Sequence, residues 1–147
     1  MAELKELNLT YFEEIRTLFY SVFASPPWDE DWSDEHQLRE YLLDLMEVRT
    51  PLILGLYEDG KMIGVSVGNI RHWCGGTEYF IEELCIRTEL QHKGYGTAFL
   101  SLIETYLKER DLHQIYLNTE RHVPAYDFYK KLGFTELPEH VSFFKEF

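Results

Sequence analysis

The stretch Leu84-Cys85-Ile86-Arg87-Thr88-Glu89-Leu90-Gln91-His92-Lys93-Gly94-Tyr95-Gly96-Thr97 decides the fold. Its first residues are typical of a strand, its middle is a loop, and a long amphipathic helix begins at about Gly94. Because glycine has no Cβ, Gly94 and Gly96 let the backbone approach a bulky ligand. The free N–H groups at a helix start and the positive end of the helix dipole suit a pyrophosphate, and Lys93 adds positive charge. The segment therefore predicts an anion-binding turn between a strand and a helix.

Two phosphate-binding motifs do not fit this segment. A Walker loop requires G-x-x-x-x-G-K-[ST], which the sequence lacks. The dinucleotide fingerprint requires a third glycine at the position that Phe99 occupies. Taken alone, Gly94-x-Gly96 also fits a helix entry that binds no ligand.

The residues before this segment predict two helices and then an antiparallel meander. Thr10 and Glu13 form a T-x-x-E capping box for the first helix, which must end before Ser25-Pro26-Pro27 because proline cannot continue it. Ser33 is suited to cap the second helix. Strands are expected at residues 52–57, 62–70 and 79–87, joined by turns at 58–61 and 73–76.

The residues after it predict a helix, a strand, a second helix and a last strand. The first of these helices runs from about Gly94 to Arg110, and the short strand covers 114–117. The second helix begins near Pro124 and ends at Gly133. The loosely alternating tail, 141–147, is expected to form the last strand. This order predicts one domain over residues 1–147, an α/β (α+β) sandwich around one mixed sheet.

Composition and charge exclude several classes of protein. Hydrophobic residues make up 45% of the 147 residues and aromatic residues 16%, which argues against disorder. No apolar run approaches the ~18–20 residues of a membrane span, and the start lacks a secretory signal, so we expect a cytoplasmic protein without a membrane partner. The net charge of −12 argues against a nucleic-acid partner and attracts cations. The acidity also fits a role in solubility alone.

Cysteine and histidine give no sign of a disulfide framework or a metal site. Cys74 and Cys85 are too few for a framework, and we expect two ordinary thiols, with a catalytic Cys–His pair as the alternative. The six histidines are scattered without metal-ligand spacing, so no metal is expected.

Two motifs, in the right order and about 30 residues apart, resemble those of the GNAT superfamily of N-acetyltransferases. Gln91-x-x-Gly94-x-Gly96 is similar to the acetyl-CoA loop of that family, Q/R-x-x-G-x-G/A. Ala125-x-x-Phe128-Tyr129-x-x-x-Gly133-Phe134 is similar to its second signature. The resemblance covers roughly residues 51–135 and extends to the small-molecule, aminoglycoside 6′-N-acetyltransferase-like subgroup. It implies the GNAT fold: a central mixed, mostly antiparallel sheet, whose strands 4 and 5 splay apart, flanked by about four helices.

The resemblance also implies how acetyl-CoA is held. Backbone groups of Leu84 and Ile86 would bind the pantetheine arm, and the Ile86 N–H would stabilise negative charge on the thioester oxygen. The family often has an asparagine at the position of His122, where imidazole can also form a hydrogen bond. The pyrophosphate would lie on the amides of Gln91, His92, Lys93, Gly94, Tyr95, Gly96 and Thr97.

Three residues are candidates for proton transfer. The resemblance places Tyr129 to donate a proton to the leaving thiolate, and a phenol with a reference pKa of ~10 is a plausible donor. The alternative for Tyr129 is a core tyrosine bonded to a backbone carbonyl. Glu82 and Glu83 interrupt an apolar strand near the thioester, and either is a candidate base for the amine. Strand alternation sends them to opposite faces unless a bulge intervenes. We rank Glu83 first because it resembles the acid that precedes the cofactor-binding strand end in some aminoglycoside 6′-N-acetyltransferases; surface or salt-bridged glutamates are the alternative.

The acceptor side is expected in the loop between the first two helices. Its aromatic and acidic residues Trp28, Asp29 and Trp32 fit a polyamine or aminosugar, and a solvated turn with anchored tryptophans is the alternative. The leading hypothesis is therefore transfer of acetyl from acetyl-CoA to a small cationic amine by direct attack in a ternary complex. A protein or peptide N-acetyltransferase and a non-catalytic acyl-CoA-binding module remain alternatives. Many members of the family that the chain resembles pair through their C-terminal strands, so the resemblance also implies a homodimer whose contact edge is residues 141–144.

Overall fold

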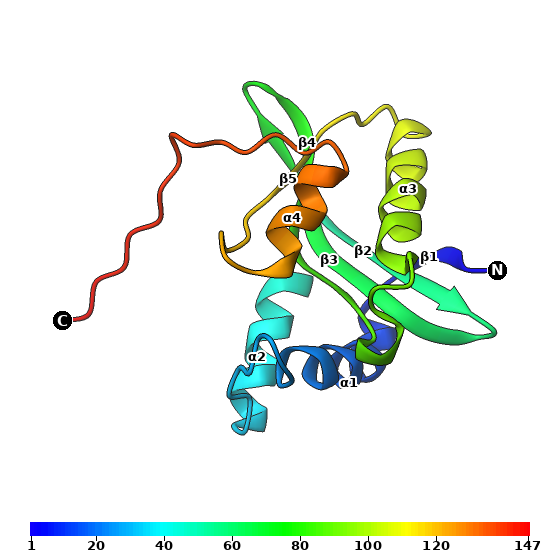
Figure 1. The fold of residues 1–147 in the computed structure, drawn as a ribbon, viewed down its shortest axis with the longest axis vertical. Coiled ribbons are helices and arrows are strands. Elements are labelled where there is room, and N and C mark those ends of the chain that lie inside the picture. Colours follow the sequence, from blue (N-terminus) through cyan, green and yellow to red (C-terminus); the bar gives the residue numbers. More distant parts are fainter.

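The computed structural model describes residues 1–147 as a five-stranded sheet covered by helices on both faces (Figure 1). The strand order in space is the order in the chain, β1-β2-β3-β4-β5. The first four strands pair antiparallel, and β5 is parallel to β4. The strands are β1 (Glu3–Leu7), β2 (Pro51–Glu58), β3 (Lys61–Trp73), β4 (Gly76–Ile86) and β5 (Ile115–Leu117).

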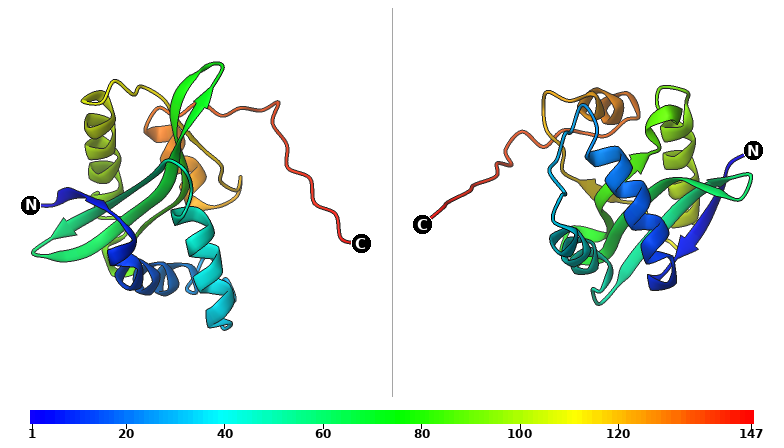
Figure 2. Two further views of the ribbon diagram at one scale, coloured as in Figure 1. Left: turned by 180° about the vertical axis from the view of Figure 1, so that it is seen from behind. Right: turned by 90° about the horizontal axis from the view of Figure 1, so that it is seen from below.

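Four α-helices and two short 3-10 turns complete the fold. The helices are α1 (Phe12–Phe23), α2 (Glu35–Met46), α3 (Tyr95–Lys108) and α4 (Pro124–Lys131), and the turns are η1 (Leu9–Tyr11) and η2 (Thr88–Leu90). Helices α1 and α2 pack on one face of the sheet, whereas α3 and α4 pack on the other (Figure 2). The mixed α/β fold expected from the sequence is therefore confirmed. No helix has the length and apolar character that crossing a bilayer requires.

Side-chain alternation along the central strands creates the two cores. In β2, Ile53 and Tyr57 join the cluster under α1 and α2, and Leu54 and Leu56 join the cluster under α3. The β2–β3 turn has Asp59 at φ 51° and Gly60 at φ 75°, as a two-residue hairpin requires. This hairpin lies where the sequence predicted it.

The capping residues predicted for the first two helices are both wrong. Thr10 does not cap α1: it lies in η1, where the Asn8 side chain accepts hydrogen bonds from both the amide and the hydroxyl of Thr10. Asp34, not Ser33, caps α2, and its carboxylate accepts from the Gln37 amide at 3.1 Å. Asn8 thus caps η1, and α1 begins after Tyr11 without a side-chain cap. At α2 an aspartate one position later replaces the predicted serine, and the two residue types are about equally good caps.

Both ends of the chain differ from the expectation. β1, which the sequence analysis did not anticipate, is an edge strand on β2 and buries only Leu7. The predicted last strand is wrong: residues 141–147 form no regular structure, and the tail leaves the body of the molecule (Figure 1). Val141, Phe143, Phe144 and Phe147 are fully or largely exposed. Weak alternation alone does not form a strand, because the backbone also needs a neighbouring strand for its hydrogen bonds.

The sheet opens between β4 and β5. β5 pairs with β4 only along Tyr79–Ile81, and its last residue, Leu117, is opposite Ile81. β4 continues to Ile86, still paired with β3 but without a neighbour on the other side. The edge of β4 from residue 82 to 86 is therefore open, which confirms the splay of strands 4 and 5.

Candidate active site

A cavity of about 380 Å³ lies where β4 and β5 separate. Its walls come from β4, from the segment after β5, from α4 and from the α1–α2 loop. It is lined by Phe23, Trp28, Glu30, Ile81, Glu82, Glu83, Leu84, Leu117, Asn118, Thr119, Glu120, Ala125, Tyr129 and Ser142. Four of these residues are glutamates and none is cationic, so the cavity favours a positively charged group.

A bulge in β4 brings both candidate bases to this cavity. The pairing register shifts at this point, since Val67 of β3 faces Glu83 while Gly68 faces Ile81. Glu82 is the extra residue, and it is exposed while Glu83 is half-buried. A Cβ on Gly68 would lie 2.1 Å from the Phe80 carbonyl oxygen, so the close backbone contact at the bulge requires glycine. The strict alternation that would have separated the two glutamates is therefore broken at this point.

The environment of Glu83 makes it a proton acceptor near neutral pH. Burial raises the pKa of the Glu83 carboxyl to about 7, and the negative charges of Glu30 and Glu82 act in the same direction. The hydroxyl of Tyr41 on α2 donates a hydrogen bond to Glu83 Oε2 and partly offsets this rise. A carboxyl with such a pKa exchanges protons readily at physiological pH.

Tyr129 faces the same cavity from α4. Its ring packs edge-on against Phe128 and Phe134, with centroid distances of 5.3 and 5.2 Å. Its hydroxyl makes no hydrogen bond with any protein group, so the bond to a backbone carbonyl expected of a core tyrosine does not occur. Burial, and then the charge of Glu83, raise the pKa of Tyr129 above its ordinary value. Tyr129 therefore carries its proton at any physiological pH.

The glycine turn before α3 has the form of an anion site. Gly94 is left-handed, with φ 90°, and nothing lies within 4 Å of where its Cβ would be. The first backbone hydrogen bond of α3 runs from Ala98 to the Gly94 carbonyl at 3.1 Å, so the amides of residues 95, 96 and 97 are free. Lys93 forms no ion pair and leaves its charge available. This turn fits a pyrophosphate, and the open edge of β4 fits an extended arm.

Gln91 has a role that the sequence did not indicate. Its side-chain amide donates to the Ile86 carbonyl at 2.9 Å, which ties the turn to the end of β4. Leu84 lines the cavity, whereas Ile86 is buried beside it in the core under α3. His122 is exposed and lines neither this cavity nor the larger groove described below.

The α1–α2 loop contributes differently from the expectation. Trp28 lines the cavity, whereas Asp29 does not, and Trp32 packs against Tyr41 outside the lining. Instead of Asp29, its neighbour Glu30 lines the cavity. Sequence reasoning also missed Tyr41, because its helical spacing in α2 was that of a core residue. The acidic character of the loop was the signal for Glu30, although it could not tell which carboxylate lines the cavity.

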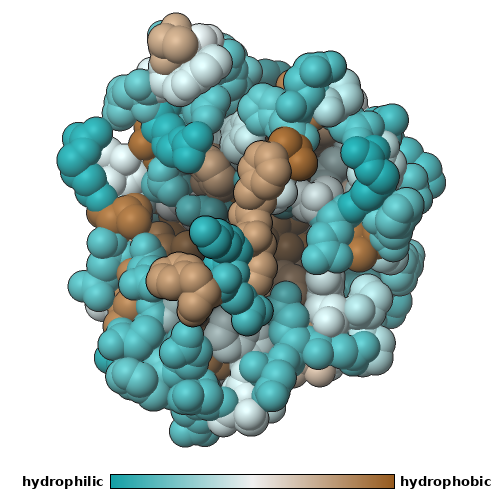
Figure 3. Space-filling model, turned by 90° about the vertical axis from the view of Figure 1, so that its left-hand side faces the viewer, coloured by the Kyte–Doolittle hydropathy of each residue, from teal (hydrophilic) through white to brown (hydrophobic).

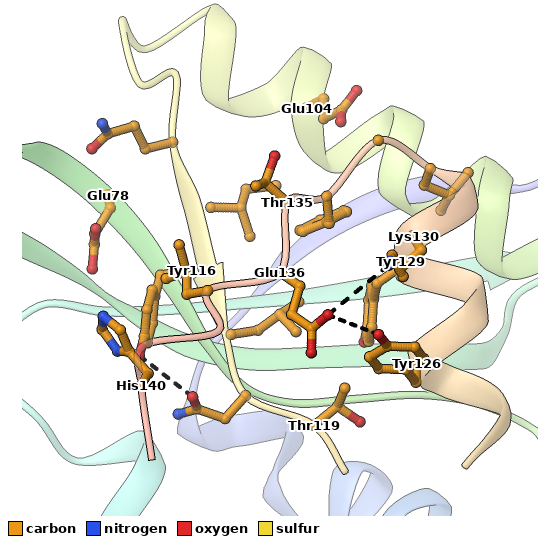
Figure 4. A pocket seen from close by; sticks show the side chains of 18 of the residues that line it. Glu78, Glu104, Tyr116, Thr119, Tyr126, Tyr129, Lys130, Thr135, Glu136 and His140 are labelled. Atoms are coloured by element: carbon orange, nitrogen blue, oxygen red, sulfur yellow. Dashed lines mark hydrogen bonds and ion pairs between the residues drawn. The ribbon is translucent and has the colours of Figure 1, made fainter. Parts of the chain in front are cut away.

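A second, larger groove of about 1020 Å³ runs along the free edge of β5. Its walls are α3, α4 and the first part of the tail. Figure 4 shows Tyr126 and Lys130 of α4 pointing toward Glu136, with the Tyr126 hydroxyl 2.8 Å and the Lys130 ammonium 3.9 Å from its carboxylate. Figure 3, which views the side from which the tail emerges, shows apolar surface in a hollow among hydrophilic side chains.

Comparison with known proteins gives one family and one fold. The model of a family described as "Acetyltransferase (GNAT) family" matches residues 9–134. A possible acetyltransferase from Clostridium difficile 630 superposes with a TM-score of 0.80 at 14% identity, covering 100% of this chain and 99% of that one. No curated protein matches the sequence.

Two aminoglycoside enzymes share the same fold. An aminoglycoside acetyltransferase from an uncultured soil metagenomic sample, solved with sisomicin, has a TM-score of 0.75 at 17% identity, covering 99% of this chain and 96% of that one. The enzyme AAC(6′)-Iy, solved with a bisubstrate analogue of CoA and acetylneamine, has a TM-score of 0.71 at 18% identity, covering 99% and 98%. At these identities the likeness shows the fold alone.

Proposed function

The chain belongs to the acetyltransferase (GNAT) family, and on this premise we propose that it transfers an acetyl group from acetyl-CoA to a primary amine of a small cationic substrate. The observation that carries the proposal is the cavity at the splay, which holds Glu83, Tyr129 and no cationic side chain. We propose that the amine attacks directly, with both substrates bound at once. Acetyl-CoA supplies the acetyl thioester for this reaction.

The glycine turn and the open edge of β4 are the proposed holding site for acetyl-CoA. The free amides of Tyr95, Gly96 and Thr97 and the charge of Lys93 suit its pyrophosphate. The backbone of β4 at Leu84 and Ile86 suits the extended pantetheine arm. We also propose contacts from Gln91, His92 and Gly94 in the turn and from the exposed side chain of His122; like the turn itself, His122 lies outside the lining of both cavities.

Two residues of the cavity are suited to move the protons. An ammonium group has no lone pair, so it must lose a proton before it attacks. Glu83, with its pKa raised to about 7, takes that proton. As the C–N bond forms and the C–S bond breaks, the departing sulfur takes the electron pair and a proton from Tyr129. The nitrogen then loses its second proton, which restores the Tyr129 hydroxyl, so the products are the amide and the free CoA thiol, with the first proton left on Glu83. The Ile86 N–H is aligned by β4 to stabilise charge on the carbonyl oxygen.

The lining of the cavity supports a cationic acceptor. Glu30, Glu82 and Glu120 surround the proposed base, and Trp28 offers an aromatic face to an ammonium group. The structurally similar enzyme solved with sisomicin provides a relevant test compound. Both cysteines are free, which fits a reducing compartment such as the cytoplasm.

We propose further that two copies associate through the tail. β5 has a free edge, and the groove beside it accommodates an extended segment. Phe143, Phe144 and Phe147 are exposed on a tail that leaves its own body. Seating the tail of one copy on β5 of another would bury these rings and pair the open edge.

The experiment for the proposed function is an acceptor screen. Purified protein is incubated with acetyl-CoA and aminoglycosides, polyamines, amino acids or short peptides, and the acetylated amine is identified by mass spectrometry. Acetylation of a cationic small molecule supports the proposal, whereas acetylation of peptides alone replaces it with a peptide acetyltransferase. Calorimetric binding of acetyl-CoA without any acetylated product favours a non-catalytic binding module.

A further inference from the structure

Two carboxylates of the cavity are each held by one aromatic donor. The Tyr41 hydroxyl donates to Glu83 Oε2, and the Trp32 indole Nε1 donates to Glu30 Oε1 at 2.8 Å. No other protein group donates a hydrogen bond to either carboxylate. Neither aromatic residue lines the cavity itself, so both act from behind its wall.

The two aromatic residues form one packed unit. The rings of Trp32 and Tyr41 are stacked, with centroids 5.2 Å apart and planes at 28°. Both contact Phe19 of α1, at centroid distances of 5.8 and 6.0 Å, and Phe19 is 1% exposed. This anchoring in the core holds both donors in one packed unit, and each donor binds one carboxylate.

We propose that Trp32 and Tyr41 are a pair of positioning residues, which hold Glu30 and Glu83 so that each presents one free oxygen to the acceptor amine. Tyr41 occupies Oε2 of Glu83 and leaves Oε1 to take the proton. Trp32 occupies Oε1 of Glu30 and leaves Oε2 for a cationic group of the substrate. This inference rests on the proposed function of the cavity and assigns to it two residues outside the lining.

The charges around Glu83 give the pair a measurable signature. Glu83 faces Tyr41 from α2, Glu30 from the α1–α2 loop, Tyr129 from α4, and Glu82 and Cys85 from its own strand. Burial raises the pKa of Tyr41 well above its ordinary value, so it remains a donor at every pH of interest. Its bond stabilises only the ionised form of Glu83, whereas the charge of Glu30 disfavours that form.

The test is the pH dependence of kcat/KM for an accepted amine in three variants. The rise of kcat/KM on the acidic side of the profile (the acidic limb) reports the ionisation of Glu83. In Tyr41→Phe this limb is expected to move to higher pH by about one to two units, because the Glu83 carboxylate loses a charge-assisted hydrogen bond. In Glu30→Gln it moves to lower pH, because a neighbouring negative charge is gone. Trp32→Phe keeps the stack and is expected to raise KM several-fold without moving the limb.

Tyr57→Phe is the matched control. Tyr57, like Tyr41, donates a hydrogen bond to a glutamate, in this case Glu14 at 3.0 Å, but neither Tyr57 nor Glu14 lines the cavity. This variant should keep the wild-type profile. A carboxyl titration of Glu83 by NMR in the free protein gives the same shifts without any turnover.

Three results would overturn the inference. The first is a Tyr41→Phe variant whose kcat/KM is lowered by the same factor at every pH. The second is a limb that moves as far in Tyr57→Phe as in Tyr41→Phe. The third is a limb that moves in the same direction in Tyr41→Phe and in Glu30→Gln. A wild-type protein without acetyl transfer would instead refute the proposed function, and the NMR titration would still decide whether Tyr41 holds Glu83.

Discussion

Gly96 of α3 packs directly against the ring of Phe128 on α4: a Cβ on Gly96 would lie 3.0 Å from Phe128 Cζ. This contact joins the two motifs that carry the family resemblance. Phe128 is followed by Tyr129, the proposed acid, so the close approach of α3 and α4 also sets the position of Tyr129. The second glycine of the turn is therefore favoured by packing against Phe128, independently of any ligand.

A larger residue at position 96 should disturb α4. Gly96→Val is expected to lower the free energy of unfolding by about 1–3 kcal/mol, because it overpacks the contact with Phe128. Denaturant unfolding measures this. In the double variant with Phe128→Leu, part of the loss should return; two losses that simply add would show that the residues do not interact.

The raised pKa of Glu83 predicts a pH-dependent stability. The Glu83 carboxyl binds its proton more tightly in the folded state than in the unfolded chain. Its contribution to the free energy of unfolding is therefore fully present below pH 4.5 and is lost as the pH rises through about 7. The glutamine of Glu83→Gln cannot ionise, so at pH 8 the free energy of unfolding of this variant should exceed that of the wild type by about 1–3 kcal/mol. At pH 4 the two proteins should be alike. If the variant is no more stable than the wild type at pH 8, the pKa of the Glu83 carboxyl is not raised by burial.

Substitutions in the α1–α2 loop should raise the acceptor KM only where the residue lines the cavity. Trp28→Ala and Glu30→Gln remove cavity-lining groups and are expected to raise the acceptor KM about tenfold or more, with a smaller effect on acetyl-CoA. Asp29→Asn removes an exposed charge and serves as the control with a nearly unchanged KM. Steady-state kinetics with one cationic amine decide this. The opposite ranking would place the acceptor elsewhere.

The tail should govern association. The full chain is expected to be a dimer by light scattering at micromolar concentration, and a chain that ends at Pro138 should be a monomer. Trp73→Ser is the control, because it removes an aromatic side chain that is 63% exposed at the β3–β4 turn and should leave the dimer intact. A full-length monomer, or a dimer without the tail, would exclude the proposed contact.

Local signals predicted the parts of the fold that depend on neighbouring residues. The glycine turn, the start of α4 at Pro124 and the positive φ of Gly133 follow from backbone chemistry over a few residues. β1 was missed because a strand of three charged and two apolar residues is recognisable only once β2 is beside it. The tail alternates weakly, but it lacks such a partner in its own chain.

The site was predictable in its chemistry and not in its contacts. Glu82 and Glu83 were named from their place in an apolar strand and Glu83 was preferred by resemblance, whereas the bulge that brings both to the cavity depends on the register with β3. Tyr41 has the spacing of a core residue, and its bond to Glu83 spans 42 positions of the chain. Trp32 was named as a substrate residue, whereas its indole holds Glu30 from behind the wall. Such pairings arise from tertiary packing.

The most direct test of acetyl transfer at this site is the rate of free-thiol release from acetyl-CoA, measured with and without a cationic amine. Amine-dependent release is expected in the wild type, reduced about 10²-fold or more in Tyr129→Phe and in Glu83→Gln near neutral pH. Undiminished amine-dependent release in both variants would place the chemistry elsewhere. Failure of the wild type to bind acetyl-CoA at all would contradict the account as a whole.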